Sequence, residues 1–339
     1  MPIDDFNILF TCSGRRVALL DSFRAAKTQL GVGGKIIATD ITPASAALHK
    51  ADLGLVVPMV DHDKYVPTLL EQVRRHRVKL LVPLTDIDLL PLAHHREEFL
   101  AAGCTIMIGS EQAVTICRDK DQTHRLLEAG RLPTIRTLSL EEFRGKPFYP
   151  CFIKPIRGSA SVGSAILHST KELREHVAVY GERLIVQEYL SGQEYTLDVY
   201  RSRDGVVRCV VPRQRLVVRS GEAEKAVTVR DDELIAATCK VAALVDLWGV
   251  FCCQCRRDND GGPPRFFEIN PRFGGGAPLS IAAGADLPLY LLQEVLGLPI
   301  TAELGRYQEN LLMLRYDDAV FTPVDQLHDL PGFQSPQIR

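Results

Sequence analysis

The 339-residue chain lacks any long apolar run, and no stretch approaches the roughly 20 residues that a membrane-spanning helix requires. It also lacks an excess of charge, because 40 Lys and Arg nearly balance 42 Asp and Glu and leave a net charge of −2. This balance gives no general attraction to nucleic acids or membrane surfaces. No basic region followed by an apolar stretch and a cleavage site is visible near the N-terminus, so we expect no signal peptide.

The nine cysteines lack the spacing of a disulfide framework or of a zinc site. Their number is odd and they are scattered. Cys252 and Cys253 would point to opposite faces of a strand, and no second Cys or His pair follows at finger spacing. We therefore expect buried structural thiols and a reduced, cytoplasmic protein. Repeats and low-complexity tracts are also missing, and the composition is that of a globular protein.

Short apolar strands alternate with helical stretches over residues 6–113. We expect strands at residues 6–10, 35–40, 54–58, 80–83 and 105–109, with helices at 17–30 and 65–77. This alternation predicts an α/β domain with a parallel sheet and helices on both faces. Beyond residue 113 the expected helices are residues 113–130 and 231–247, and the expected strands are 152–155, 165–167, 183–190, 194–200 and 206–218.

In a parallel sheet, the loops at the carboxyl ends of the strands form the binding crevice. Ser13–Arg16, Asp40 and Thr85–Asp86 follow such strands. The first loop has a single glycine where a dinucleotide fingerprint needs three, so NAD binding is not expected. Arg15 and its neighbour at a helix start suit a carboxylate or phosphate substrate group. The alternative is a plain helix cap with solvated arginines.

The most informative segment is Phe266–Gly276. In a strand, Glu268 and Asn270 would share one face, while Phe267 and Ile269 would share the other. A carboxylate and an amide oxygen two residues apart are ligands suited to Mg²⁺. Arg272 adds a fixed cation beside them, and the following glycines allow the backbone to approach a bulky anion.

A second strand, residues 249–256, is followed by the turn-forming segment 258–264. A hairpin centred near Gly261 would set Gln254 opposite Glu268, with Cβ atoms roughly 5 Å apart. One surface would then carry an amide, a carboxylate and a second amide. The alternative, an ordinary edge hairpin with polar residues in solvent, explains neither the arginine nor the glycines that follow.

Gln254 and the run from Glu268 to Arg272 resemble the metal-binding end of the ATP-grasp superfamily, in particular the branch similar to the large subunit of carbamoyl phosphate synthase. In that family the Gln, Glu and Asn hold Mg²⁺ and the Arg contacts the transferred phosphate. For this chain the resemblance implies Gln254, Glu268 and Asn270 as metal ligands, for Mg²⁺ or alternatively Mn²⁺, with Arg272 as a catalytic residue.

The resemblance covers essentially the whole chain and implies an ATP-grasp fold, α/β overall and α+β in the ATP-binding part. Residues 1–113 are expected to form a Rossmann-like N-terminal domain. Residues 114–190 are expected to form a small lid, and residues 191–339 the large domain with the metal site.

Lys154 precedes a loop of small residues, Gly158–Ser164, which is no P-loop because Ser164 stands where lysine is required. Taken alone, the loop is as readily a hairpin turn as a flap. The resemblance implies a flap whose Ser159 and Ser161 approach the ATP phosphates, with Lys154 beside them. Lys120 resembles the earlier family lysine, which reaches the α-phosphate, although a lysine on a helix is usually solvated.

The segment Gln187-Glu188-Tyr189-Leu190 resembles the hinge that holds adenine. The backbone of Tyr189 and Leu190 would read the base edge, and Gln187 or Glu188 would add a polar contact. Glu194 resembles the acid that holds the ribose hydroxyls, the alternative being exposed strand polarity.

A further strand carries Arg213 and Arg215 on one face. Two guanidinium groups so placed are able to hold a carboxylate or a phosphoryl group of a substrate. A salt-bridged surface strand is an equal alternative.

The resemblance implies an ATP- and Mg²⁺-dependent ligase that joins a small-molecule carboxylate to an amine through an acyl phosphate. Carbamoyl phosphate synthesis is not expected, because that enzyme's large subunit carries two such halves and this chain carries one. A non-catalytic ATP-binding regulatory protein and a small-molecule kinase of the same fold are the alternatives. The expected partners are the small-molecule carboxylate and amine, not nucleic acid or membrane, and assembly as a homodimer is left open.

Overall fold

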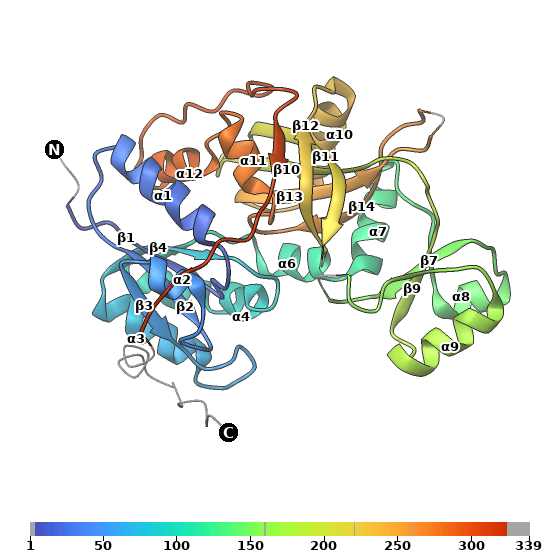
Figure 1. The fold of residues 1–339 in the computed structure, drawn as a ribbon, viewed down its shortest axis with the longest axis horizontal. Helices are drawn as coiled ribbons and strands as arrows, with labels where there is room; N and C mark the ends of the chain where they lie inside the picture. The colour runs from blue at the N-terminus through green and yellow to red at the C-terminus, as the bar shows by residue number, and fades with distance from the viewer. Residues whose placement is uncertain (1–3, 159–160, 220, 260, 324–339) are drawn as a thin grey trace.

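The computed structural model describes residues 4–158, 161–219, 221–259 and 261–323, which form three lobes (Figure 1). The N-terminal lobe contains a parallel sheet of five strands in the order β3-β2-β1-β4-β5. Its strands are β1 Asn7–Thr11, β2 Ile36–Asp40, β3 Leu53–Val56, β4 Val78–Pro83 and β5 Thr105–Ile106. The prediction of five strands in a parallel α/β sheet is confirmed.

Helices cover both faces of this sheet, because successive residues of β1 enter different cores. Ile8 and Phe10 pack toward α1, whereas Leu9 packs toward α3, α4 and α5. The helices of this lobe are α1 Val17–Gln29, α2 Ala46–Lys50, α3 Tyr65–Arg75, α4 Leu89–His94 and α5 Arg96–Ala101. The late helices α11 Ala277–Ala282 and α12 Leu287–Val295 pack on α1, so the chain returns to its first lobe (Figure 1).

The central lobe contains an antiparallel sheet in the order β14-β13-β10-β11-β12-β15. Its strands are β10 Glu194–Arg201, β11 Val207–Arg219, β12 Glu222–Thr228, β13 Gly249–Arg256, β14 Arg265–Asn270 and β15 Leu312–Leu314. Helix α10 Asp232–Leu244 packs on one face of this sheet. It shares a core with the helical segment of residues 111–129. The opposite face of β10, β11, β13 and β14 lines the cavity described below.

The single helix expected over residues 113–130 is wrong in one respect, because it is two helices, α6 Glu111–Arg118 and α7 Lys120–Ala129. Asp119 adopts an extended conformation between them, and its side chain accepts a hydrogen bond from the backbone N–H of Gln122 at 3.1 Å. Aspartate suits this position because its carboxylate satisfies an otherwise unpaired N–H at the helix start. Lys120 is therefore the first residue of α7, and both helices pack against β14.

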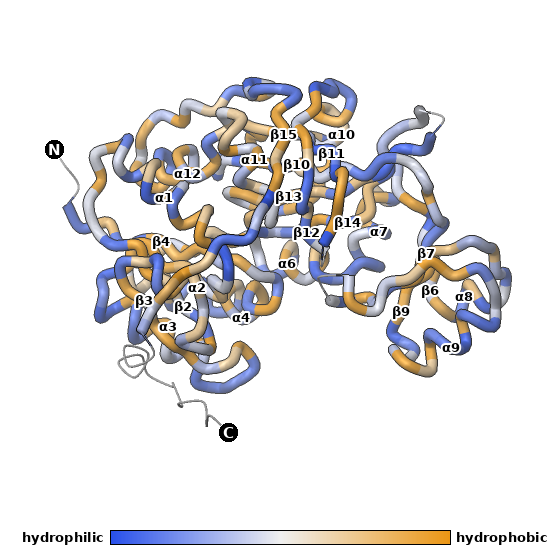
Figure 2. Tube along the Cα trace, in the orientation of Figure 1, coloured by the Kyte–Doolittle hydropathy of each residue, from blue (hydrophilic) through white to orange (hydrophobic). Residues whose placement is uncertain are grey.

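The small lobe contains a four-stranded antiparallel sheet in the order β6-β9-β7-β8 with its own apolar core. Its elements are β6 Thr137–Ser139, α8 Leu140–Gly145, β7 Cys151–Pro155, β8 Ala165–Leu167, α9 Thr170–Tyr180 and β9 Leu184–Glu188. Apolar residues follow the strands of all three sheets, while the connecting loops are mostly polar (Figure 2).

All nine cysteines are free thiols, and seven of them are buried. The predicted burial of Cys252, Cys253 and Cys255 is therefore confirmed. Among the described residues, no helix combines the length and the apolar character needed to cross a bilayer.

Candidate active site

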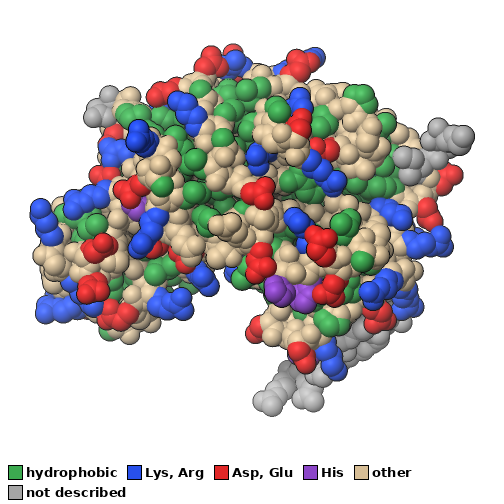
Figure 3. Space-filling model, turned by 180° about the vertical axis from the view of Figure 1, so that it is seen from behind, with side chains coloured by type: hydrophobic (Ala, Val, Ile, Leu, Met, Phe, Trp, Pro, Cys, Tyr) green, Lys and Arg blue, Asp and Glu red, His purple; other side chains and the backbone are tan. Residues whose placement is uncertain are grey.

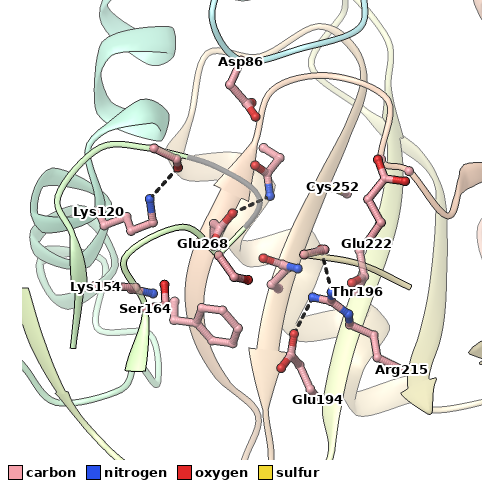
Figure 4. Close-up of a pocket in the computed structure, with 18 of the residues that line it drawn as sticks. Asp86, Lys120, Lys154, Ser164, Glu194, Thr196, Arg215, Glu222, Cys252 and Glu268 are labelled. Atoms are coloured by element: carbon pink, nitrogen blue, oxygen red, sulfur yellow. Dashed lines mark hydrogen bonds and ion pairs between the residues drawn. The ribbon is translucent and has the colours of Figure 1, made fainter. Parts of the chain in front are cut away.

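A cavity of about 660 Å³ lies where the three lobes meet. Seen from behind, the molecule has a deep recess between its two lower lobes (Figure 3). The cavity is lined by the sheet of the central lobe, by β7 and β9 of the small lobe, and by loops after β1 and β4 of the N-terminal lobe. Lys154, Ser164 and Glu194 lie toward one end of it, Asp86 lies at the other, and Glu268 lies between (Figure 4).

The predicted register of the hairpin is confirmed, because Gln254 on β13 pairs directly with Glu268 on β14. Cys252 pairs with Asn270 in the same ladder. Gln254, Glu268 and Asn270 all line the cavity and are partly exposed to it. An amide, a carboxylate and a second amide from two neighbouring strands thus meet at one surface.

Phe267 was expected on the opposite face, and that prediction is wrong. A β-bulge between Gln254 and Cys255 pairs Cys255 with Phe266 and leaves Phe267 as an extra residue. Phe266 and Ile269 enter the core, whereas Phe267 lines the cavity. A bulge changes the side of the sheet on which the next side chain lies, and strict alternation does not reveal it.

The amide of Gln254 has two orientations that exchange its oxygen and nitrogen. With the nitrogen toward Glu268, it donates to both carboxylate oxygens at 3.2 and 3.3 Å, and its oxygen accepts from Arg215 at 2.6 Å. With the oxygen toward Glu268, two acceptors face each other. That arrangement is repulsive in the free protein, but two oxygen ligands of one cation adopt it.

The donor set therefore fits Mg²⁺, provided that the amides turn their oxygens toward it. In the free protein Asn270 Nδ2 also donates to Glu268, at 3.0 Å. Among the described residues, no three His, Cys, Asp or Glu side chains are grouped so that they could hold a metal. A metal here would thus depend on amide oxygens beside a single carboxylate.

Lys154 on β7 is buried, with its side chain aimed at the cavity (Figure 4). Its Nζ lies 4.9 Å from the centre of the Phe267 ring, so the bulge supplies a cation–π contact. Burial lowers the pKa of Lys154 to about 8, although the nearby Glu268 opposes the shift. The charged form is desolvated and only partly compensated, which suits a group that meets an anionic ligand.

Lys120 lies at the start of α7, and its Nζ donates to the backbone oxygen of Gly158 at 3.0 Å, at the entry of the small-residue loop. Both residues line the cavity, as does Ser161. Ser159 was also predicted to approach the phosphates and lies outside the described residues.

The predicted hinge lies at the end of β9. Gln187 is buried and donates to Thr137 Oγ1 at 2.8 Å. Glu188 accepts from the backbone N–H of Arg136 and pairs with Arg265. Tyr189 and Leu190 follow along the cavity wall. The two polar side chains are thus engaged by partners within the protein, and they line the cavity together with the two residues that follow β9.

Glu194 forms an ion pair with Arg215 (Figure 4) and a second one with Arg256. Arg215 also donates to the carbonyl oxygen of Gly221. The arginine predicted as a substrate ligand thus holds the acid predicted for ribose. Both side chains are mostly buried, so the strand is salt-bridged but is not a surface strand.

Arg213 is 1% exposed and forms a bidentate pair with Asp198, itself fully buried. Ser280 Oγ donates to the same carboxylate at 2.6 Å. The glycine run passes directly over this pair, because a Cβ atom at Gly276 would lie 2.2 Å from Arg213 Nη1. Both Arg213 and the glycines border the cavity, and the Arg213–Asp198 pair packs beneath the glycines.

Two ion pairs at the Asp86 end join the N-terminal lobe to the central lobe. Arg272 Nη2 donates to Asp86 at 2.6 Å, and Arg16 pairs with Glu222 at 3.1 Å. Arg15 is exposed at the rim of the cavity. Sequence reasoning did not assign a site role to Glu222. It follows a glycine in a turn, and nothing nearby in the chain marks it as facing a cavity.

Cys252 also lines the cavity, between Asp198 and Asn270 in neighbouring strands. Burial raises the pKa of its thiol to about 12. The thiol therefore stays protonated at neutral pH and is a poor nucleophile.

Three family profiles match successive parts of the chain. Residues 8–107 match "PylC-like, N-terminal domain". Residues 125–219 match "D-ala D-ala ligase C-terminus". Residues 181–317 match "ATP-grasp in the biosynthetic pathway with Ter operon".

Among curated proteins, formate-dependent phosphoribosylglycinamide formyltransferase of Synechococcus sp. (strain CC9605) is 31% identical over 191 residues, 51% of this chain and 46% of that protein. D-alanine–D-alanine ligase of Clostridium perfringens (strain SM101 / Type A) is 26% identical over 179 residues, 47% of this chain and 58% of the ligase. The matches thus span about half the length of these relatives.

The fold is similar to that of the ADP complex of purK, N5-carboxyaminoimidazole ribonucleotide synthetase. The TM-score is 0.72 at 17% identity, covering 92% of this chain and 82% of that one. This likeness concerns the fold alone. The three family profiles, matched over residues 8–107, 125–219 and 181–317, show that the chain belongs to the ATP-grasp superfamily.

Proposed function

We propose that this protein is an ATP- and Mg²⁺-dependent ligase that joins a small-molecule carboxylate to an amine and releases ADP and phosphate. One observation carries the proposal: Lys154, Glu268 and Arg272 come from different strands and loops yet line a single cavity with two amide side chains. A protein that only binds nucleotide has no need to keep these groups together.

The chemistry needs two steps. A carboxylate oxygen attacks the γ-phosphorus of ATP, the bond to the ADP oxygen breaks, and an acyl phosphate forms. The amine then attacks the acyl carbon, phosphate leaves, and the amine loses a proton. Catalysis of such phosphoryl transfer consists mainly of positioning and charge neutralisation.

The residues of the cavity are suited to those tasks. Gln254, Glu268 and Asn270 would hold Mg²⁺, which when bound neutralises charge on the transferred phosphoryl group. Lys154 would supply a cation against the ATP phosphates from the side of the small lobe. Arg272 would supply one from the opposite side. No protein nucleophile is required, in agreement with the protonated thiol of Cys252.

The nucleotide would lie between the small lobe and the central sheet. Lys120 and the loop that includes Ser159 and Ser161 would cover its phosphates and exclude water, which would otherwise hydrolyse the acyl phosphate. The backbone after β9, at Tyr189 and Leu190, would border the base, with Gln187 or Glu188 adding a polar contact. Glu194 would face the ribose.

The decisive experiment measures ADP release by the purified protein with ATP, Mg²⁺ and arrays of carboxylates and amines. Hydroxylamine, a small amine nucleophile, replaces the unknown amine in a parallel array and converts any acyl phosphate to a hydroxamate. We expect ADP release that depends on both an acid and an amine. An array in which no acid yields ADP or a hydroxamate would contradict the proposal.

The same experiment separates the two alternatives. A kinase would release ADP with an acid or alcohol alone and would accumulate a stable phosphorylated product. A non-catalytic regulatory protein would bind ATP without turnover. Arg15, Arg213 and Arg215 are the arginines proposed to contact the substrate, and the last two are already engaged by Asp198 and Glu194.

The finer predictions belong to the same proposal. These are membership in the branch similar to carbamoyl phosphate synthase, a cytoplasmic location, use of Mn²⁺ in place of Mg²⁺, and assembly as a homodimer. The division into an N-terminal domain of residues 1–113, a lid of residues 114–190 and a large domain of residues 191–339 is also retained as a proposal.

A further inference from the structure

Two ion pairs of opposite polarity cross from the N-terminal lobe to the central lobe beside the cavity. In one, Arg16 of the N-terminal lobe meets Glu222 of the central lobe. In the other, Asp86 of the N-terminal lobe meets Arg272 of the central lobe. The second pair involves the arginine to which phosphoryl transfer is assigned above, and its carboxylate comes from 186 residues earlier in the chain.

Asp86 dominates the surroundings of Arg272. The guanidinium donates to Asp86 Oδ2 at 2.6 Å, to the backbone oxygen of Phe273 at 3.1 Å and, more weakly, to Asn270 Oδ1 at 3.4 Å. Among the described residues, Asp86 is the only carboxylate within ion-pair distance of it. Burial is the largest single influence and lowers the pKa of Arg272, but the combined effect of its neighbours, led by Asp86, exceeds it and raises the pKa, so the group stays charged.

The loop that carries Asp86 is itself held in place by the fully buried carboxylate of Asp88. Asp88 accepts hydrogen bonds from the hydroxyl groups of Thr11 on β1, Tyr65 on α3 and Thr85 in the same loop. Three donors from three segments satisfy one buried acid, which fixes the loop relative to the parallel sheet. The loop that carries Asp86 is therefore anchored to the parallel sheet through Asp88.

We propose that Asp86 is a positioning residue, which acts through its ion pair with Arg272 to aim the guanidinium at the transferred phosphoryl group. The N-terminal lobe would then complete the phosphoryl-transfer site in addition to bordering the substrate. This inference rests on the proposed function, because it assumes that Arg272 faces a phosphoryl group.

Electrostatics alone predicts the opposite sign from positioning. Asp86 carries a negative charge near a site for an anion, so its removal should strengthen phosphate binding if charge were its only contribution. If Asp86 orients Arg272, its removal releases the guanidinium and phosphate binding weakens. The direction of the change therefore distinguishes the two roles.

The test measures binding of inorganic phosphate to the protein loaded with MgADP, by calorimetry, so no knowledge of the carboxylate or amine is needed. We expect Asp86→Asn to weaken phosphate binding roughly tenfold or more, the effect of losing an oriented charged hydrogen bond. MgADP affinity should stay within about twofold of wild type. Asp86→Glu, which keeps a carboxylate, should recover most of the phosphate affinity.

Asp5→Asn is the control. Asp5 also belongs to the N-terminal lobe and forms an ion pair, with Arg77 at 3.2 Å, but it is exposed and does not line the cavity. The substitution removes one negative charge and one ion pair without affecting Arg272, so phosphate affinity should stay level.

Each result decides the matter. Unchanged or tighter phosphate binding in Asp86→Asn overturns the positioning role, as does loss of MgADP binding in that variant, which would mark Asp86 as structural. Wild-type protein that binds MgADP but not phosphate overturns it as well. Wild-type protein that binds no MgADP defeats the proposed function itself.

Discussion

Two buried cations line the same cavity, but only one of them is paired with a carboxylate. Lys154, from the small lobe, makes no ion pair among the described residues and meets mainly aromatic rings, and burial lowers its pKa to about 8. Arg272, from the central lobe, is paired with Asp86 at 2.6 Å, and its pKa is raised. One cation lacks a counter-ion in the free protein, and the other already has one.

The difference indicates two functions for positive charge in one site. A buried lysine without a counter-ion destabilises the free protein but gains more when an anionic ligand arrives, since the desolvation has already occurred. A paired arginine contributes orientation and loses little of its geometry on binding. Glu268 lies near both and raises the pKa of each, so the proposed metal ligand connects the two cations electrostatically.

The largest effect is expected from removing that shared carboxylate. Glu268→Ala should leave the fold intact and lower the rate of Mg²⁺-dependent ADP formation by roughly 10²- to 10³-fold, because the metal loses its only charged ligand. Steady-state assays over a range of Mg²⁺ concentrations measure this. The control is Glu111→Ala on α6, whose acid pairs with His94 at the surface. Full activity in Glu268→Ala would reject the metal assignment.

The next effect concerns stability and the paired cation. Arg272→Met should lower the free energy of unfolding by about 2–3 kcal/mol, because Asp86 is left partly buried without its counter-ion. The midpoint of thermal unfolding should fall accordingly. Arg144→Met, which breaks an exposed pair with Glu182, serves as the control and should change the midpoint little. If Arg272→Met leaves the free energy of unfolding unchanged, the proposed difference in stability between Arg272 and Lys154 is wrong.

The unpaired cation should behave in the opposite way. Lys154→Met removes a desolvated charge and keeps a side chain of similar length, so the free protein should gain about 1–3 kcal/mol at pH 7. The same variant should lose roughly 10- to 100-fold in ATP affinity, the effect of one charged contact. Thermal unfolding and calorimetry test the two parts separately. A destabilised Lys154→Met, or one with unchanged ATP affinity, would contradict this assignment.

The smallest effect is a pH dependence. Because Lys154 has a pKa of about 8 in the free protein, it is charged below that pH and becomes neutral above it. MgADP affinity should therefore fall as pH rises from 8 to 9, by up to about tenfold per unit. Stability of the free protein should rise from pH 8 toward 10.5, since the unfolded chain then binds the additional proton.

The control for that pH profile is Lys154→Met, in which both trends should flatten. A wild-type profile that does not change between pH 7 and 9 would show that Lys154 keeps its charge and that its environment is less desolvating than its burial indicates.

Much of the framework follows from local patterns. The five parallel strands were predictable because strand–helix alternation with short connections permits few other arrangements. The pairing of Gln254 with Glu268 was predictable because turn-forming residues lie midway between two strands. Where a structural feature depends on residues close in sequence, the pattern of side chains was sufficient.

Other features depend on partners distant in sequence or on small departures from regular geometry. The bulge that brings Phe267 beside Lys154 breaks an alternation that otherwise looks regular. The break at Asp119 was hidden because residues 118–125 are all polar, so no apolar pattern marks where one helix ends and the next begins. The burial of Arg213 was also not predictable, because the glycine run that covers it is distant in sequence.

The class of fold and the kinds of ligand atoms available can be predicted from the residues alone, because hydrophobic period and turn residues act over a few positions and side-chain chemistry is fixed by identity. Which of the cations are already neutralised depends on the folded chain. The charge of a guanidinium or ammonium group is known from its residue type, but its counter-ion depends on which distant carboxylate the folded chain brings within about 4 Å. That choice separates Arg272 from Lys154.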